Sequence, residues 1–114
     1  MTAENPNDQT RRAGPQAVIT MPAEIDAANA DQVRQALLSA ASPDATVLII
    51  DMSATTFCDS AGVHAIIAAY RQAAAAGTQL RLVTTSVLRI FQITGADQLI
   101  PIYPTLDAAQ APPK

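Results

Sequence analysis

The chain has a single cysteine, Cys58, among its 114 residues, and it has no tryptophan. One cysteine cannot form an internal disulfide, and no residue spacing typical of a zinc site is present, so we expect no metal. The missing disulfides favour a reducing, cytoplasmic location. Aromatic residues make up only 4% of the chain and apolar residues 49%. This composition predicts an aliphatic core of the size that one domain needs.

Basic clusters and long apolar runs are also scarce. Seven Lys and Arg against ten Asp and Glu give a net charge of −3, and only Arg11 and Arg12 are adjacent. Nucleic-acid binding needs a clustered basic face, so nucleic acid is not an expected partner. No apolar run approaches the roughly 18 residues of a membrane span, and the polar first 14 residues lack a signal-peptide core. We therefore expect no direct insertion into a membrane.

Strand-like and helix-like patterns alternate along the chain. Strands are expected at residues 17–21, 46–50, 80–84 and 99–103, and helices at about 28–41, 60–76, 85–94 and 105–110. Such alternation favours an α/β fold with a four- to five-stranded mixed, largely parallel sheet packed with about four helices. Pro101 interrupts the last strand and predicts an edge position for it.

The sequence also predicts two tails and the limits of the third helix. The polar composition of residues 1–15 predicts a flexible N-terminal tail, and residues 111–114 form a Pro-rich C-terminal tail. The folded domain is then expected over residues 16–110. Thr85 or Ser86 is expected to cap the third helix, with Gly95 as its stop.

The segment from Asp51 to Gly62 carries the strongest functional signal. An apolar run ends at Asp51, and Asp59 and Ser60 stand directly before a helical pattern. A serine where a strand has ended and a helix begins is either a helix cap or a phosphorylation switch. Asp51 is expected to bond loop N–H groups, as Asp side chains commonly do after a strand. Cys58 is expected to be a small buried hydrophobe.

In this order, the motifs resemble the STAS domain family, and specifically bacterial anti-sigma factor antagonists. The resemblance covers about residues 17–110. It rests on the segments 49–53 and 57–62, on Glu24-Ile25-Asp26, on Gly77 before 80–83, and on 89–91 with 94–95. Three departures stand out: Ala61 replaces a second serine, Ala23 replaces a glycine, and an N-terminal strand pair is hard to find.

The resemblance implies a partner-switching mechanism. Members of this family bind an anti-sigma factor that is also a serine kinase with an ATPase-type fold, and so free the sigma factor. The kinase phosphorylates the serine after the motif aspartate, here Ser60, and a serine phosphatase reverses this. Asp26 and Asp59 would lie close to Ser60, and the partner-binding residues would be Asp26, Asp59, Ser60 and Gly62. The resemblance implies no catalytic residue and no cofactor.

Two alternatives stay open at this point. A STAS subunit of a membrane lipid-transport ATPase complex, with a structural or regulatory role, would share the fold and an Asp-Ser/Thr-x-Gly motif. A hydrolase using Ser60 with His64, four residues further on, would need an orienting carboxylate and oxyanion donors. The Gly-x-Ser-x-Gly elbow is absent. We therefore expect a binding protein that is not an enzyme.

Overall fold

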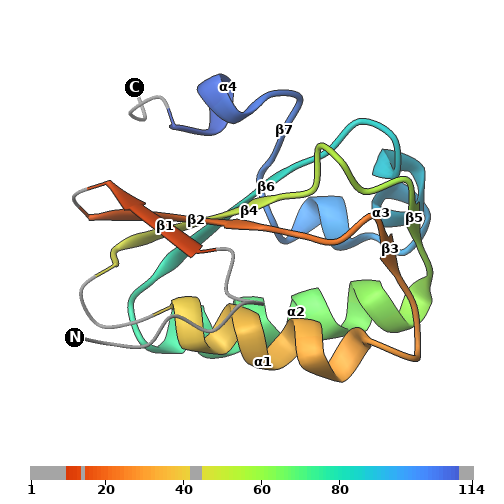
Figure 1. The fold of residues 1–114 in the computed structure, drawn as a ribbon, viewed down its shortest axis with the longest axis horizontal. Helices are drawn as coiled ribbons and strands as arrows, with labels where there is room; N and C mark the ends of the chain where they lie inside the picture. The colour runs from red at the N-terminus through yellow and green to blue at the C-terminus, as the bar shows by residue number, and fades with distance from the viewer. Residues whose placement is uncertain (1–9, 14, 42–44, 111–114) are drawn as a thin grey trace.

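A five-stranded sheet in the order β1-β2-β4-β6-β7 forms the centre of the computed structural model (Figure 1). The structure describes residues 10–13, 15–41 and 45–110. Its strands are β1 (Thr10–Ala13), β2 (Gln16–Thr20), β3 (Glu24–Ile25), β4 (Val47–Asp51), β5 (Phe57–Cys58), β6 (Gln79–Val83) and β7 (Ile102–Tyr103). Its helices are α1 (Ala30–Ala40), α2 (Ser60–Ala75), α3 (Leu88–Ile93) and α4 (Leu106–Gln110), with a 3₁₀ turn η1 (Ala96–Gln98).

The sheet is mixed, and four of its five strands are parallel. β2, β4, β6 and β7 run parallel, while β1 pairs antiparallel with β2. The central strand β4 is a continuous apolar run, and Leu48, Ile49 and Ile50 are all fully buried. Strands covered on both faces require such runs, because neither side of the strand meets water. The predicted fold class is therefore confirmed.

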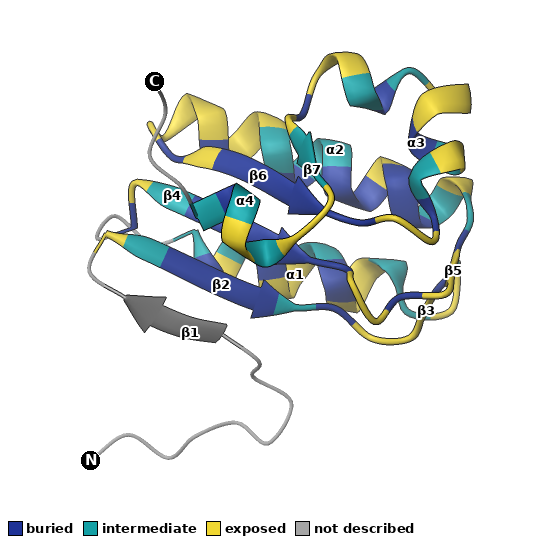
Figure 2. Cartoon of the chain, turned by 90° about the horizontal axis from the view of Figure 1, so that it is seen from above, coloured by how far each residue is buried: buried dark blue, intermediate teal, exposed yellow. Residues whose placement is uncertain are grey.

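The helices cover the sheet unequally. α1 and α2 lie side by side across one face, with α3 beside them (Figure 1). Val33 and Leu37 of α1, Ile66 of α2 and Phe91 of α3 belong to the main core cluster on that face. Among the described helices, only the short helix α4 packs on the opposite face (Figure 2). Its residue Ala109 belongs to the second buried cluster of the sheet.

A buried arginine fastens α4 to the sheet. Arg81 of β6 is almost fully buried, and its Nη1 donates to the Ala109 carbonyl at 2.6 Å. Gln16 Nε2 of β2 donates to the Gln110 carbonyl at 3.2 Å. The last carbonyls of a helix lack intrahelical partners and carry partial negative charge, so these donors stabilise the end of α4.

The N-terminal part of the chain differs from the expected tail. Residues 10–13 form β1, with Thr10 opposite Ile19 and Ala13 opposite Gln16. The expectation of a tail through residue 15 is therefore wrong for this segment, and the fold begins before residue 16. Backbone hydrogen bonds to β2 hold an edge strand without requiring an apolar pattern in its sequence. The expected C-terminal tail, residues 111–114, lies outside the described residues.

The third helix and the last strand are shorter than expected. α3 begins at Leu88 after Val87, so neither Thr85 nor Ser86 caps it. The hydroxyl of Thr84 instead accepts from the Val87 N–H at 3.4 Å. Gly95 follows the helix in the left-handed conformation, φ 79°, as expected of a stop. β7 starts only after Pro101 and lies at the edge of the sheet, as predicted.

Candidate functional site

A two-stranded parallel ladder, β3 with β5, lies beyond the ends of β2 and β4 (Figure 1). Glu24 pairs with Phe57, and Ile25 pairs with Cys58. Asp26 and Asp59 follow these strands directly, and the Asp59 N–H donates to the Ile25 carbonyl at 3.2 Å. The ladder therefore places the two aspartates at neighbouring strand ends, with Ser60 next in the chain.

Asp59 is the N-cap of α2. Its backbone is extended, with φ −100° and ψ −174°, and its Oδ1 accepts from the Gly62 N–H at 3.2 Å. Ser60 is the first helical residue and is exposed. Of the two alternatives for Ser60, the helix cap is therefore wrong, because its neighbour does the capping. The Ser60 hydroxyl remains at the surface.

Gly62 lets α2 approach the ladder closely. A Cβ built at this buried position would lie 2.7 Å from Cys58 Sγ and 2.7 Å from the Cγ2 of Ile25. Real Cβ atoms do not approach other atoms this closely, so a larger residue would push α2 away from β3 and β5. Gly62 thus sets the position of Ser60 through packing.

A hydrogen-bonded turn holds Asp26. Its Oδ1 accepts from the Ala28 N–H at 2.9 Å, and its own N–H donates to Asn29 Oδ1 at 3.0 Å. Asn29 Nδ2 also donates to the Glu24 carbonyl at 2.9 Å. The turn does not require a glycine at position 23, because Ala23, like every other described non-glycine residue, has a negative φ.

Asp51 orders the loop between β4 and β5. Its Oδ1 accepts from both the N–H of Ser53, at 3.0 Å, and the Ser53 hydroxyl, at 2.7 Å. The hydroxyl of Thr55 in the same loop donates to the Pro22 carbonyl at 2.8 Å and so ties it to the segment before β3. The predicted role of Asp51 is confirmed.

Cys58 is buried behind the site. Burial raises the pKa of its thiol from an ordinary 9.0 to about 11, and the negative charge of Asp59 adds to this effect. Its Sγ faces the position where Gly62 lacks a side chain. The prediction of a small buried hydrophobe is confirmed.

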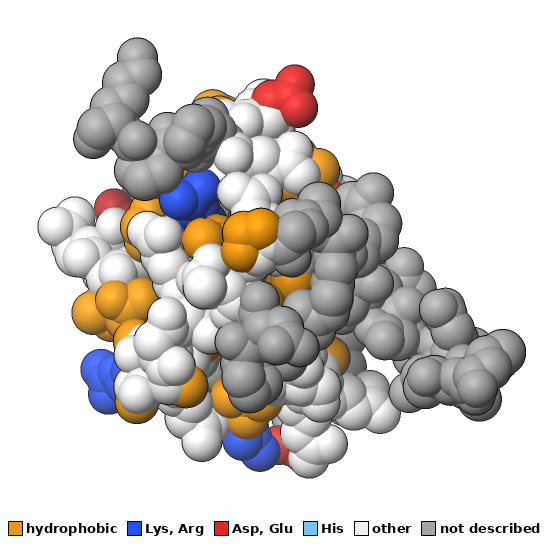
Figure 3. Space-filling view, turned by 90° about the vertical axis from the view of Figure 1, so that its left-hand side faces the viewer, with side chains coloured by type: hydrophobic (Ala, Val, Ile, Leu, Met, Phe, Trp, Pro, Cys, Tyr) orange, Lys and Arg blue, Asp and Glu red, His pale blue; other side chains and the backbone are white. Residues whose placement is uncertain are grey.

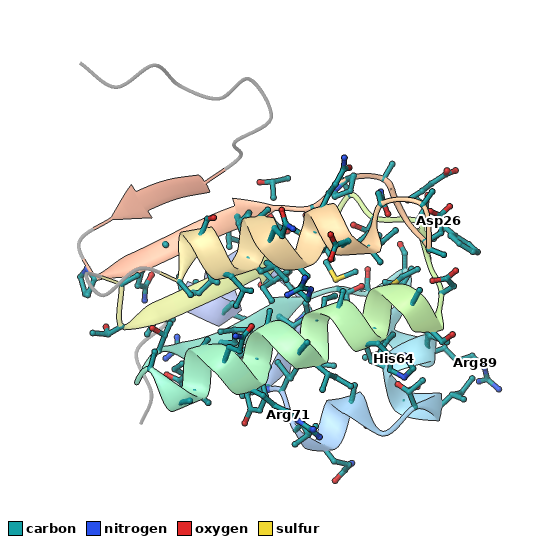
Figure 4. All side chains as sticks on the ribbon, turned by 90° about the horizontal axis from the view of Figure 1, so that it is seen from below. Asp26, His64, Arg71 and Arg89 are labelled. Atoms are coloured by element: carbon teal, nitrogen blue, oxygen red, sulfur yellow. The ribbon has the colours of Figure 1, made fainter. Side chains whose placement is uncertain are left out.

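Three exposed side chains near these residues were not foreseen as parts of the surface. Phe57 is 49% exposed, although the next residue of β5, Cys58, is buried, because adjacent residues of a strand point to opposite faces. His64 of α2 and Arg89 of α3 are also exposed. Figure 4 shows His64, Arg89 and Asp26 at the same end of the molecule. At the opposite end, the visible charged side chains are scattered (Figure 3).

Two further classes of site have no support in the part of the chain that the structure describes. In residues 10–13, 15–41 and 45–110, no group of three His, Cys, Asp or Glu side chains could hold a metal ion. No helix among these residues is both long enough and apolar enough to cross a membrane.

The strand–loop–helix arrangement agrees with a match to a family profile. The profile of the STAS domain family matches residues 7–109, nearly the whole chain. The chain belongs to the STAS domain family. This match also begins ahead of β1, in agreement with the strand found there. No curated protein sequence matches the chain.

Several solved protein structures resemble this one over most of the chain. An anti-sigma factor antagonist from Mycobacterium paratuberculosis is 28% identical, with a TM-score of 0.79 over 88% of this chain and 86% of that chain. The Bacillus cell fate determinant SpoIIAA in its phosphorylated form is 23% identical, with a TM-score of 0.66 over 89% and 94%. A sulfate transporter family protein from Wolinella succinogenes is 17% identical, with a TM-score of 0.73 over 93% and 92%. The last two show the shared fold alone.

Proposed function

We propose that this STAS domain is a cytoplasmic anti-sigma factor antagonist that is switched off by phosphorylation of Ser60. Its partner would be an anti-sigma factor serine kinase with an ATPase-type fold, and a serine phosphatase would restore the active form. The observation that carries the proposal is the exposed Ser60 hydroxyl, at the first position of α2, beside an aspartate that already caps the helix. The likeness to the antagonist from M. paratuberculosis supports it.

The modification is a phosphoryl transfer from ATP. The Ser60 Oγ forms a bond to the γ-phosphorus while the bond from that phosphorus to the ADP oxygen breaks. The hydroxyl proton passes to a base of the kinase, and ADP leaves. The product carries about −1.5 to −2 additional charges at neutral pH.

The switch would act through surface charge. The cap bond to Gly62 holds Asp59, and the turn at Ala28 and Asn29 holds Asp26. A phosphate placed beside these two carboxylates turns a mildly acidic surface into a strongly acidic one. Like charges brought together at an interface cost several kcal/mol, so a kinase surface suited to the unmodified site would be released without refolding of the domain.

The proposed partner surface combines charge with one apolar side chain. Asp26, Asp59 and Ser60 would contact the kinase, and the exposed ring of Phe57 would provide buried apolar area beside them. Aromatic side chains are frequent anchors of interfaces. Gly62, being buried, would contribute by holding α2 against the ladder. The domain would act by binding, with no cofactor and no catalytic residue.

A pull-down from the native host tests the proposal. The baits are tagged wild type, Ser60→Asp, which mimics the phosphate charge, and Ser60→Ala as the matched neutral control. We expect mass spectrometry to find a small ATPase-fold kinase with wild type and Ser60→Ala, and to find it lost with Ser60→Asp. Transporter ATPase subunits recovered equally by all three baits would overturn the proposal and favour the lipid-transport alternative.

A further inference from the structure

We propose that His64 is the counter-ion of the phosphate on Ser60. This inference rests on the proposed function, because it concerns the modified form of the same site. His64 is the only histidine of the chain. It is exposed, as is Ser60.

The helix brings the two side chains together. Ser60 and His64 are four residues apart on α2, so they lie on the same face, one turn from each other. Side chains of an α-helix lean toward its N-terminus, so the imidazole of His64 can reach toward the turn that begins with Ser60. An acidic group placed four residues before a basic one is also the more favourable orientation of such a pair.

The acidic surroundings of Ser60 favour a cation beside the phosphate. Asp59 on α2, Asp26 after β3 and the exposed Glu24 of β3 all add negative charge near the site. The carboxylate of Asp59 already accepts the hydrogen bond of the Gly62 N–H, so this donor is not available to a phosphate. A positive side chain within reach would therefore stabilise a phosphate on Ser60.

Of the cationic side chains that the structure describes, His64 is the best placed. Arg34 forms an ion pair with Asp31 at 2.8 Å, and Arg81 is buried beneath α4. Arg71 lies about three turns further along α2. Arg89 lies at the same end of the molecule as His64 (Figure 4), but it belongs to another helix, α3. Arg89 is therefore the internal control.

A cation beside the phosphate would change the ionisation of the phosphate. The second ionisation of a phosphoserine lies near pH 6. A positive charge beside the phosphate favours its dianion, so the phosphate should lose its second proton at a lower pH.

Phosphorus NMR of a chain carrying phosphoserine at position 60 tests this contact. The modified residue is incorporated during translation, so no kinase is needed. Wild type, His64→Gln, His64→Lys and Arg89→Gln are titrated from about pH 4.5 to 8.5. We expect the titration midpoint of the phosphate to rise by about 0.3 to 0.8 pH unit in His64→Gln only. His64→Lys should keep the low midpoint, because it keeps the charge.

Two results would overturn the inference: equal midpoints in wild type and His64→Gln, or a midpoint raised by Arg89→Gln and not by His64→Gln. Circular dichroism confirms that each variant is folded, and all three substitutions are at exposed positions. If the kinase never modifies Ser60, the proposed function fails while this titration still reports the contact. Equal midpoints with an active kinase overturn the role of His64 alone.

Discussion

At position 62, the lack of a side chain determines how the candidate site is built. Ile25 and Cys58 occupy the space that a Cβ would need, and α2 therefore rests directly on the β3–β5 ladder. The same contact keeps the thiol of Cys58 away from water. One residue thus links the strand ends that carry Asp26 and Asp59 to the helix that carries Ser60.

Gly62→Ala is expected to destabilise the domain. The added methyl overpacks two contacts at 2.7 Å, which costs about 1–3 kcal/mol and outweighs the gain of about 1 kcal/mol in helix propensity. Urea denaturation of wild type and variant measures the difference. Combining Gly62→Ala with Cys58→Ala removes one of the two contacts. The free energy of unfolding should therefore fall by less in the double variant than in the two single variants together. Strict additivity would contradict this packing.

The ionisation of the Cys58 thiol is expected to lower the free energy of unfolding at alkaline pH. Below pH 9.0 the thiol is protonated in both the folded and the unfolded chain, so it has no effect on the free energy of unfolding. Between pH 9.0 and about 11 the unfolded chain ionises while the folded one does not, and stability declines. We expect a decline of about 1–2 kcal/mol that Cys58→Ala lacks. Parallel stability curves for the two proteins from pH 8 to 11 would show that the thiol is not shielded.

At the scale of elements, the start of α2 assigns helix capping and the proposed phosphorylation to two different residues. Asp59 caps the helix, while Ser60 presents its hydroxyl at the surface. Asp59 therefore has a structural role through its oxygen and a proposed binding role through its charge. The two roles can be distinguished because asparagine caps a helix as well as aspartate does.

Asp59→Asn should keep the stability of the domain within about 0.5 kcal/mol, whereas Asp59→Ala should lose about 1 kcal/mol. If the charge contacts the partner kinase, both variants should bind it more weakly to a similar degree. Thermal unfolding and calorimetric binding measure the two quantities on the same samples. Binding by Asp59→Asn equal to wild type would restrict this residue to its capping role.

At the scale of the whole molecule, the regular elements were predictable and the connections were not. The strands β2, β4 and β6 and the helices α1 and α2 have apolar patterns of clear period, and the structure has them within a few residues of the predicted ranges. The strands β3 and β5 have two residues each, too few to show a period. β1 is held by backbone pairing, which polar side chains do not reveal.

The candidate site was likewise predictable in part. The motif around Ser60 could be found in the sequence because its residues are contiguous. The close approach at Gly62 depends on the β3–β5 ladder, which joins segments about 33 residues apart. The exposure of Phe57, His64 and Arg89 likewise follows from packing between distant segments.

The most direct test of the account compares the binding of the purified cognate kinase to the unmodified domain and to the domain with phosphoserine at position 60. We predict that the phosphate weakens binding at least tenfold, which corresponds to about 1.4 kcal/mol. The Ser60→Ala domain should bind as the unmodified one does. Equal affinity of the phosphorylated and unmodified domains would contradict a switch at Ser60.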